Sequence, residues 1–404
     1  MGVLVKKQKG IILTGIVKLS TISFIASLSS SLIDTIWAIY LNSFVNSIAI
    51  VGFISASLAI VAFLSYFFII PIIEKYNKIK VYITTLLLFA TTYILFAINT
   101  KFYIFIILAF VITILYSLRI TSFGILIKDE SSKKQLSRNE GIMYTFMDVA
   151  WLIGPLISGF ISEEYGIGKV FILSAIFLII AILLFKILKI KNHKNIKKKI
   201  DHKFTKNFKD FFKNKDRGLA YILGGGVNFW WSLIYLFIPI LILKNNLHIY
   251  WVGYFLFAIP IPLLIFQYPF SKLAGKIGFK TIFKIGFIIP CIFALICFFM
   301  GNIYVIMILL ILASIGLAML APTTEAYFFD ILKGKEDLRF YGPYNTTIDL
   351  NHFISRFSAA IILVFLPFKF LFLFFSLAMF IFFLISFKTR NIIEEKRNDK
   401  QNKI

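Results

Sequence analysis

The sequence predicts an all-α integral membrane protein in which twelve transmembrane helices form two similar six-helix halves. Three observations predict this fold class. Apolar runs of about 20 residues recur along the chain, and each can cross a hydrocarbon core about 30 Å thick. One long basic segment, from Lys186 to Arg217, interrupts these runs near the midpoint. The runs before and after that segment can be overlaid at one constant offset.

Composition and charge narrow the class of protein further. Hydrophobic residues make up 59% of the 404 residues and the mean hydropathy is +0.88, which excludes a soluble fold. The net charge of +24 does not indicate a nucleic-acid partner, because Lys and Arg beside apolar runs are typical of cytoplasmic loops. Cys291 and Cys297 share one apolar run and have no nearby His or acid. We therefore expect a lipid bilayer around the protein, and no nucleic acid, metal or cofactor.

Twelve spans are predicted in order, each separated from the next by polar or basic residues. The first half gives 19–42, 47–73, 80–99, 102–127, 141–162 and 168–190, and the second gives 218–243, 250–271, 280–300, 302–328, 343–366 and 368–387. The first apolar run is too long for a signal peptide and lacks a small-residue cleavage site, so we interpret it as a span. This organisation predicts an N-terminal half at 1–190, a basic linker at 191–217 and a C-terminal half at 218–404.

The distribution of positive charge predicts the orientation. With the N-terminus inside, only four of the 43 Lys and Arg residues fall in the outer loops or at the outer span ends beside them, namely Lys101, Lys169, Lys244 and Lys369. By the positive-inside rule, we expect a multi-pass protein of the plasma or inner membrane. Both termini and the linker are then cytoplasmic.

The two halves match without gaps at an offset of 201 residues. The matched positions include Asp129 and Asp330, Gly141 and Gly342, Thr145 and Thr346, and Asp148 and Asp349. Hydrophobicity alone does not align charged residues and glycines, so the match indicates an internal duplication. In a parallel repeat of this kind, a substrate site is expected near the bilayer midplane between the halves.

Two stretches carry recognisable motifs. After the second span the chain reads I-P-I-I-E-K-Y-N-K-I at 70–79, which is similar to G-x-L-A-D-R-x-G-R-K, with Ile70 and Asn77 in place of glycines. The fifth span contains G-P-L-I-S-G at 154–159, which is similar to G-P-x-x-G-G, with Ser158 in place of a glycine. With these motifs the whole chain resembles the major facilitator superfamily of transporters, and the second motif resembles its drug:proton antiporter branch.

The resemblance implies roles for both motifs. Glu74, Lys78 and Asp129 would form a cluster that closes the cytoplasmic side, although ordinary solvated loop charges would give the same pattern. Gly154, Pro155 and Gly159 would allow close helix approach, and Pro155 would also free a backbone carbonyl. The sequence leaves open whether that motif serves packing alone or gating.

Ionisable residues within the spans mark the candidate pathway. Such residues cost about 2.5 to 3.5 kcal/mol each on insertion, so they face inward and pair. They are Asp34, Arg119, Asp148, Asp349 and Arg356, with Glu325 close to a span end. At a rise of about 1.5 Å per residue, Arg119 matches Asp148 in depth better than it matches Asp34. A structural ion pair that locks helices is the alternative role for either arginine.

Two polar stripes reinforce this interpretation. In the eleventh span Asn345, Asp349, His352 and Arg356 recur at helical spacing, and in the fifth span Tyr144, Asp148, Trp151 and Pro155 do the same. We expect both stripes to face a central cavity. A hydrogen-bonded interior histidine is a common alternative to a proton-carrying one at His352. Trp230 and Trp231 are expected to line the cavity from the seventh span, with core packing as the alternative.

Two further positions resemble functional residues of the family. Arg119 stands where the antiporters carry R-x-x-Q-G, although Ser122 and Phe123 replace the Gln and Gly. Asp34 resembles the embedded acid of many proton-coupled members. The sequence therefore favours a monomeric secondary transporter that exports a small molecule in exchange for protons. The alternatives are an importer, either a symporter or a facilitator, and a non-transporting sensor or scaffold. A membrane enzyme is disfavoured because no catalytic constellation is found.

Overall fold

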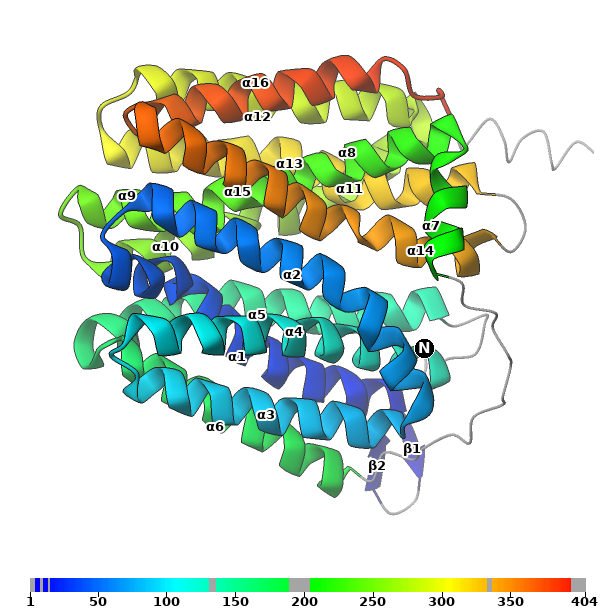
Figure 1. Cartoon of the computed structure of the whole chain (residues 1–404). Helices are drawn as coiled ribbons and strands as arrows, with labels where there is room; N and C mark the ends of the chain where they lie inside the picture. Colours follow the sequence, from blue (N-terminus) through cyan, green and yellow to red (C-terminus); the bar gives the residue numbers. More distant parts are fainter. Residues whose placement is uncertain are drawn as a thin grey trace, which may run out of the picture. The chain divides into compact units, whose positions relative to one another are not determined.

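The computed structural model describes residues 4–7, 10–13, 15–130, 136–188, 204–332 and 336–393. Within these ranges, twelve helices are long and apolar enough to cross a membrane. The predicted number of spans is therefore confirmed, and the long helices run side by side within each part of the chain (Figure 1).

The first half begins with a short hairpin that was not predicted from the sequence, in which β1 (Leu4–Lys7) pairs antiparallel with β2 (Gly10–Leu13). The helices that follow are α1 (Gly15–Val45), α2 (Ile48–Lys75), α3 (Lys78–Ile98), α4 (Phe102–Glu130), α5 (Leu136–Tyr165) and α6 (Ile167–Ile187). Gly166 joins α5 to α6 at a φ of 84°, a conformation that favours glycine.

The second half contains more, shorter elements. They are α7 (Phe204–Phe212), α8 (Lys215–Ser232), the π-helix η1 (Leu233–Phe237), α9 (Ile238–Lys244), α10 (Ile249–Ala258), α11 (Pro260–Ile277), α12 (Phe279–Phe299), α13 (Ile303–Ile331), α14 (Glu336–Asn345), α15 (Thr347–Phe365) and α16 (Lys369–Ser386). The helix α7 lies within the segment predicted to be the linker.

Three predicted spans are interrupted rather than continuous. The seventh consists of α8, η1 and α9, the eighth breaks at Ile259 before Pro260, and the eleventh breaks at Thr346. Proline at the start of α11 has no N–H to donate to the preceding turn. At the other break, the Thr346 hydroxyl donates to the carbonyl of Pro343 over 2.7 Å and closes a local turn.

The described chain folds into two compact units that exchange segments. Unit 1 comprises residues 1–44, 61–200 and 248–257, and unit 2 comprises 45–60, 201–247 and 258–404. Unit 1 thus includes most of α10 from the second half, and unit 2 includes the beginning of α2 from the first.

Each unit has an aromatic core. In unit 1 the Tyr40 ring contacts Phe96, Phe105 and Phe171, and its hydroxyl donates to the carbonyl of Phe96 over 2.9 Å. In unit 2 the rings of Phe229, Phe287, Phe375 and Phe382 are buried in mutual contact. Close van der Waals packing of this kind holds helices together where lipid removes the hydrophobic driving force.

Candidate functional site

Arg119 of α4 lies inside unit 1 against α1. Its side chain is only 9% exposed, and its Nη1 donates to the carbonyl of Ala26 over 3.2 Å and to the hydroxyl of Ser30 over 2.7 Å. The rings of Phe89 and Tyr116 lie 5.4 and 5.3 Å from the guanidinium carbon. These aromatic faces and neutral oxygens solvate the buried cation. The hydrogen bonds of Arg119 therefore go to α1, rather than to Asp148 as depth had suggested.

The two acids of unit 1 occupy different environments. Asp34 is partly buried in α1 and acts electrostatically on the same buried tyrosine, Tyr93, as Arg119 does. Asp148 lies on an exposed part of α5, while Pro155 at the other end of its stripe is buried. One electrostatic group therefore contains Asp34, Tyr93 and Arg119. Asp148 is not among the described residues that Arg119 contacts. Tyr93 and Ser30 were missed from the sequence because neutral residues carry no charge signal.

The glycines of the fifth-span motif lie at two helix contacts. A Cβ atom at Gly154 would stand 2.6 Å from the Cβ of Ser31 in α1. One at Gly159 would stand 3.0 Å from the Cα of Gly253 in α10. Between them, the Ser158 hydroxyl donates to the carbonyl of Leu32 over 2.7 Å. The motif thus holds α5 close to α1 on one face and to α10 on the other.

Beyond this motif, two glutamates at the end of α5 contact the start of α10. Glu163 accepts from the backbone N–H of Ile249 over 2.6 Å and lies 2.7 Å from Nδ1 of His248. Glu164 accepts from the Tyr250 hydroxyl. A carboxylate at a helix N-terminus is stabilised by the unpaired N–H groups there.

In unit 2 the polar stripe of the eleventh span contacts the seventh. Ser232 bridges it, lying 2.9 Å from Nδ1 of His352 and accepting from the Ser355 hydroxyl over 2.7 Å. Ser232 is the last residue of α8, directly before the π-helix. Such π-helical turns occur frequently at functional sites. The predicted stripe is divided, however, because Asn345 belongs to α14 and the other three residues to α15.

Asp349 and Arg356 complete the stripe on α15. Among the described residues, the buried Oδ2 of Asp349 has no hydrogen-bond partner, and Arg356 acts on this carboxyl electrostatically. Nη1 of Arg356 donates to the carbonyl of Ser55, 3.3 Å away in α2. One helix face therefore presents a carboxylate, an imidazole and a guanidinium.

Three consecutive glycines, Gly224 to Gly226, let α8 pack closely against its neighbours, and the middle one faces α15. A side chain at Gly225 would overlap the amide of Asn351 in α15, and the Thr347 hydroxyl donates to the carbonyl of Tyr221 over 2.8 Å. The glycine run is the signal in the sequence that could have indicated this contact.

The two tryptophans of the seventh span differ in position. Trp230 is fully buried against Phe375 of α16, which matches the core-packing alternative given above, and its cavity-lining role stays a prediction. Adjacent helical residues point about 100° apart, and Trp231 is accordingly partly exposed, with its ring 5.7 Å from that of Tyr235. Glu325 of α13 accepts a hydrogen bond from the Tyr341 hydroxyl over 3.1 Å.

The predicted cytoplasmic gate is described only in part. Lys78 begins α3, and the preceding Asn77 caps this helix by accepting from the N–H groups of Ile79 and Lys80. The side chains of Glu74 and Asp129 lie outside the described residues, so the gate stays a prediction.

The duplicated helices and intramembrane polar groups define a polytopic membrane protein of the transporter class. The family model of the Major Facilitator Superfamily matches residues 19–261 and 229–403, and the chain belongs to this family of transporters. The predicted superfamily is thus confirmed, and its drug:proton antiporter branch stays a prediction. Comparison with curated proteins gives no match.

Solved structures of three transporters share the fold. A POT family transporter in complex with 5-aminolevulinic acid is 12% identical, with a TM-score of 0.73 and coverage of 92% of this chain and 95% of that one. The nucleoside transporter NupG is 14% identical, with a TM-score of 0.74 and coverage of 94% and 100%. A bacterial homologue of the lysosomal transporter Spinster is 10% identical, with a TM-score of 0.69 and coverage of 92% and 95%.

Proposed function

We propose that this transporter is a proton-coupled antiporter that exports a small molecule by alternating access. In this mechanism the two halves rock about a site near the bilayer midplane. An acid within the membrane takes up a proton on one side and releases it on the other, and the substrate moves in the opposite direction. The resemblance of residues 154–159 to the antiporter motif favours export.

The observation that carries this proposal is the polar face of α15. Intramembrane ionisable groups are costly and are retained at ion and substrate pathways. The Oδ2 atom of Asp349 has no hydrogen-bond partner among the described residues, so it can accept a proton or a substrate donor without breaking an existing bond. In unit 1, Asp34 and Asp148 supply further candidate acids, and Arg119 lies in the electrostatic group of Asp34.

A vesicle assay with purified protein tests the proposal. Proton movement and compound movement would be recorded together for wild type, Asp34→Asn, Asp148→Asn and Asp349→Asn across a compound panel. Glu336→Gln serves as a matched control, because Glu336 precedes the eleventh span and contacts Arg217 over 3.4 Å. We expect at least one compound to move against a flow of protons in wild type. This coupling should be lost in at least one of the three Asp variants and kept in the Glu336→Gln control.

Other outcomes point to other functions. Transport that proceeds with protons in the same direction indicates a symporter, and transport without any proton requirement indicates a facilitator. In the second case the three acids would have structural roles. Absence of transport for every compound, with ligand binding retained, would favour a sensor.

A further inference from the structure

The helix α7 is docked against three other helices of unit 2 by one buried aromatic residue. Phe211 is 0% exposed, and its ring contacts those of Tyr221, Phe328 and Phe340, at centroid distances of 5.9, 6.1 and 5.9 Å. These three residues come from α8, α13 and α14. The helix therefore lies crosswise at the ends of the spans (Figure 1).

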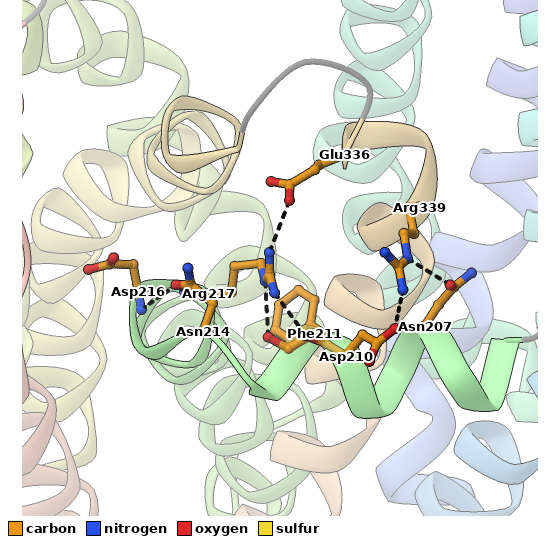
Figure 2. Close-up of polar contacts among 8 residues, drawn as sticks. All are labelled: Asn207, Asp210, Phe211, Asn214, Asp216, Arg217, Glu336 and Arg339. Atoms are coloured by element: carbon orange, nitrogen blue, oxygen red, sulfur yellow. Dashed lines mark hydrogen bonds and ion pairs between the residues drawn. The ribbon is translucent and has the colours of Figure 1, made fainter.

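Polar contacts on both sides of Phe211 fix this position (Figure 2). Arg339 of α14 pairs with Asp210 and donates to Asn207 over 2.9 Å. Arg217 donates to the backbone carbonyls of Asp210 and Phe211, over 2.8 and 3.0 Å, and so satisfies the C-terminal end of α7. The carboxylate of Asp210 thus pairs with Arg339 of α14 and with Lys213, 2.7 Å away.

The exposed side of α7 carries both cationic and apolar side chains. Lys206, Lys209 and Lys213 are exposed, and so is Phe212, at 44%. Phe212 is one turn from Lys209, so a phenyl ring and ammonium groups share one surface. The segment from Lys186 to Arg217 holds thirteen Lys or Arg residues and three Asp residues, so this surface belongs to a strongly basic stretch of sequence.

The depth of Phe212 can be derived from the span that it contacts. Its ring lies 5.0 Å from that of Tyr221, six residues into a span of 30 residues. Such a helix is about 45 Å long, whereas the hydrocarbon core is about 30 Å thick. If the excess is shared between the ends, Tyr221 lies at the edge of the hydrocarbon, and Phe212 lies at the level of the lipid headgroups.

We propose that the exposed side of α7 binds anionic phospholipid headgroups, with Lys206 and Lys209 on the phosphates and Phe212 among the headgroups at the edge of the acyl region. An interfacial helix with Lys beside Phe is suited to this position. Basic clusters next to a span attract anionic lipids electrostatically. This lipid site contains none of the residues proposed for the transport pathway, and its binding can be measured without any substrate.

The test compares the affinity of full-length protein for phosphatidylglycerol and phosphatidylcholine in detergent, by titration with each lipid. The variant is the double substitution Lys206→Gln and Lys209→Gln, which leaves the Asp210–Lys213 and Asp210–Arg339 pairs in place. The control is Lys101→Gln with Lys244→Gln, which removes the same charge from two exposed positions, one before α4 and one at the end of α9. A second variant, Phe212→Ser, tests the apolar contact.

We expect wild type to prefer phosphatidylglycerol at least ten-fold and to lose this preference as salt is raised. The Lys206/Lys209 variant should lose most of it, Phe212→Ser should bind both lipids more weakly, and the control should match wild type. An equal loss in variant and control would overturn the proposal, because it would indicate net charge rather than a site. Competition by millimolar glycerol phosphate would also overturn it and would assign the surface to soluble phosphates.

Discussion

Gly154 determines how closely α5 approaches α1. We expect Gly154→Ala to destabilise the protein by about 1–3 kcal/mol, the usual cost of overpacking, because its methyl group would meet Ser31. Gly124→Ala is the control, since no atom lies within 4 Å of a Cβ at Gly124. Melting temperatures in detergent would measure both. Ser31→Gly should restore the stability of Gly154→Ala, and failure of this rescue would contradict the contact.

Arg119 allows a structural role to be separated from a functional one. In Arg119→Met the charge disappears while much of the volume remains, and Ser30 keeps its hydrogen bond to the carbonyl of Ala26 over 3.2 Å. We expect the melting temperature to fall little, because the hydrogen-bond partners of Arg119, the Ala26 carbonyl and the Ser30 hydroxyl, are neutral and stay bonded to each other. Transport should nevertheless be lost. Unfolding of the variant, or transport at the wild-type rate, would contradict a role in the pathway.

The docking of α7 should depend on pH through Asp210. The hydrogen bond from Lys213 and the charges of Arg339 and Lys206 hold the pKa of this carboxyl below its ordinary value. The pairing therefore stabilises docking at pH above about 4. This stabilisation is lost as the pH falls through the lowered pKa. Hydrogen exchange of residues 204–212, corrected for the intrinsic rate, should show less protection at pH 3 than at pH 7.

Asp210→Asn provides the control for that experiment. The variant should exchange faster than wild type at pH 7 and show little further change on acidification. If wild type and variant share one pH profile, another group controls the docking.

The contact between α5 and α10 depends on Glu163. This carboxylate accepts from the first N–H of α10, so Glu163→Ala should remove a cap that is worth about 1 kcal/mol. Hydrogen exchange in residues 249–252 should then accelerate about five-fold. Glu164→Ala would remove only the contact to the Tyr250 hydroxyl and should have a smaller effect at the backbone. Equal effects of both variants would contradict the capping role.

The sequence predicts the number of spans well, but it does not predict where three of these spans are interrupted. Span number follows from the length of apolar runs, which is a local property. The π-helix contains neither Pro nor Gly, so its position depends on packing around α8 that no local pattern records. Similarly, spacing placed Asp349, His352 and Arg356 on one face, but the partners Ser232 and Ser55 are neutral and come from distant spans. Trp230 and Trp231 could not be distinguished without the direction of α8.

On the scale of the whole molecule, each unit needs a segment from the other half of the sequence. Residues 1–200 expressed alone lack residues 248–257, and the face of α5 at Gly159 then loses its partner Gly253. We expect this half to be unstable alone and to be recovered when residues 201–404 are co-expressed, as measured by yield in the membrane fraction. A full-length chain cut at a protease site inserted after Ile200 is the control. A stable, monodisperse half would contradict this prediction.

The π-helical turn also bears on the history of the two repeats. The first span is one uninterrupted α-helix, whereas its counterpart contains five π-helical residues after Ser232. One additional residue in a helical turn rotates everything beyond it by about 100°. Beyond η1, equivalent residues of the first and seventh spans therefore point in different directions around their helices. Since the duplication, the first and seventh spans have kept similar lengths, but the side chains beyond η1 no longer point in equivalent directions.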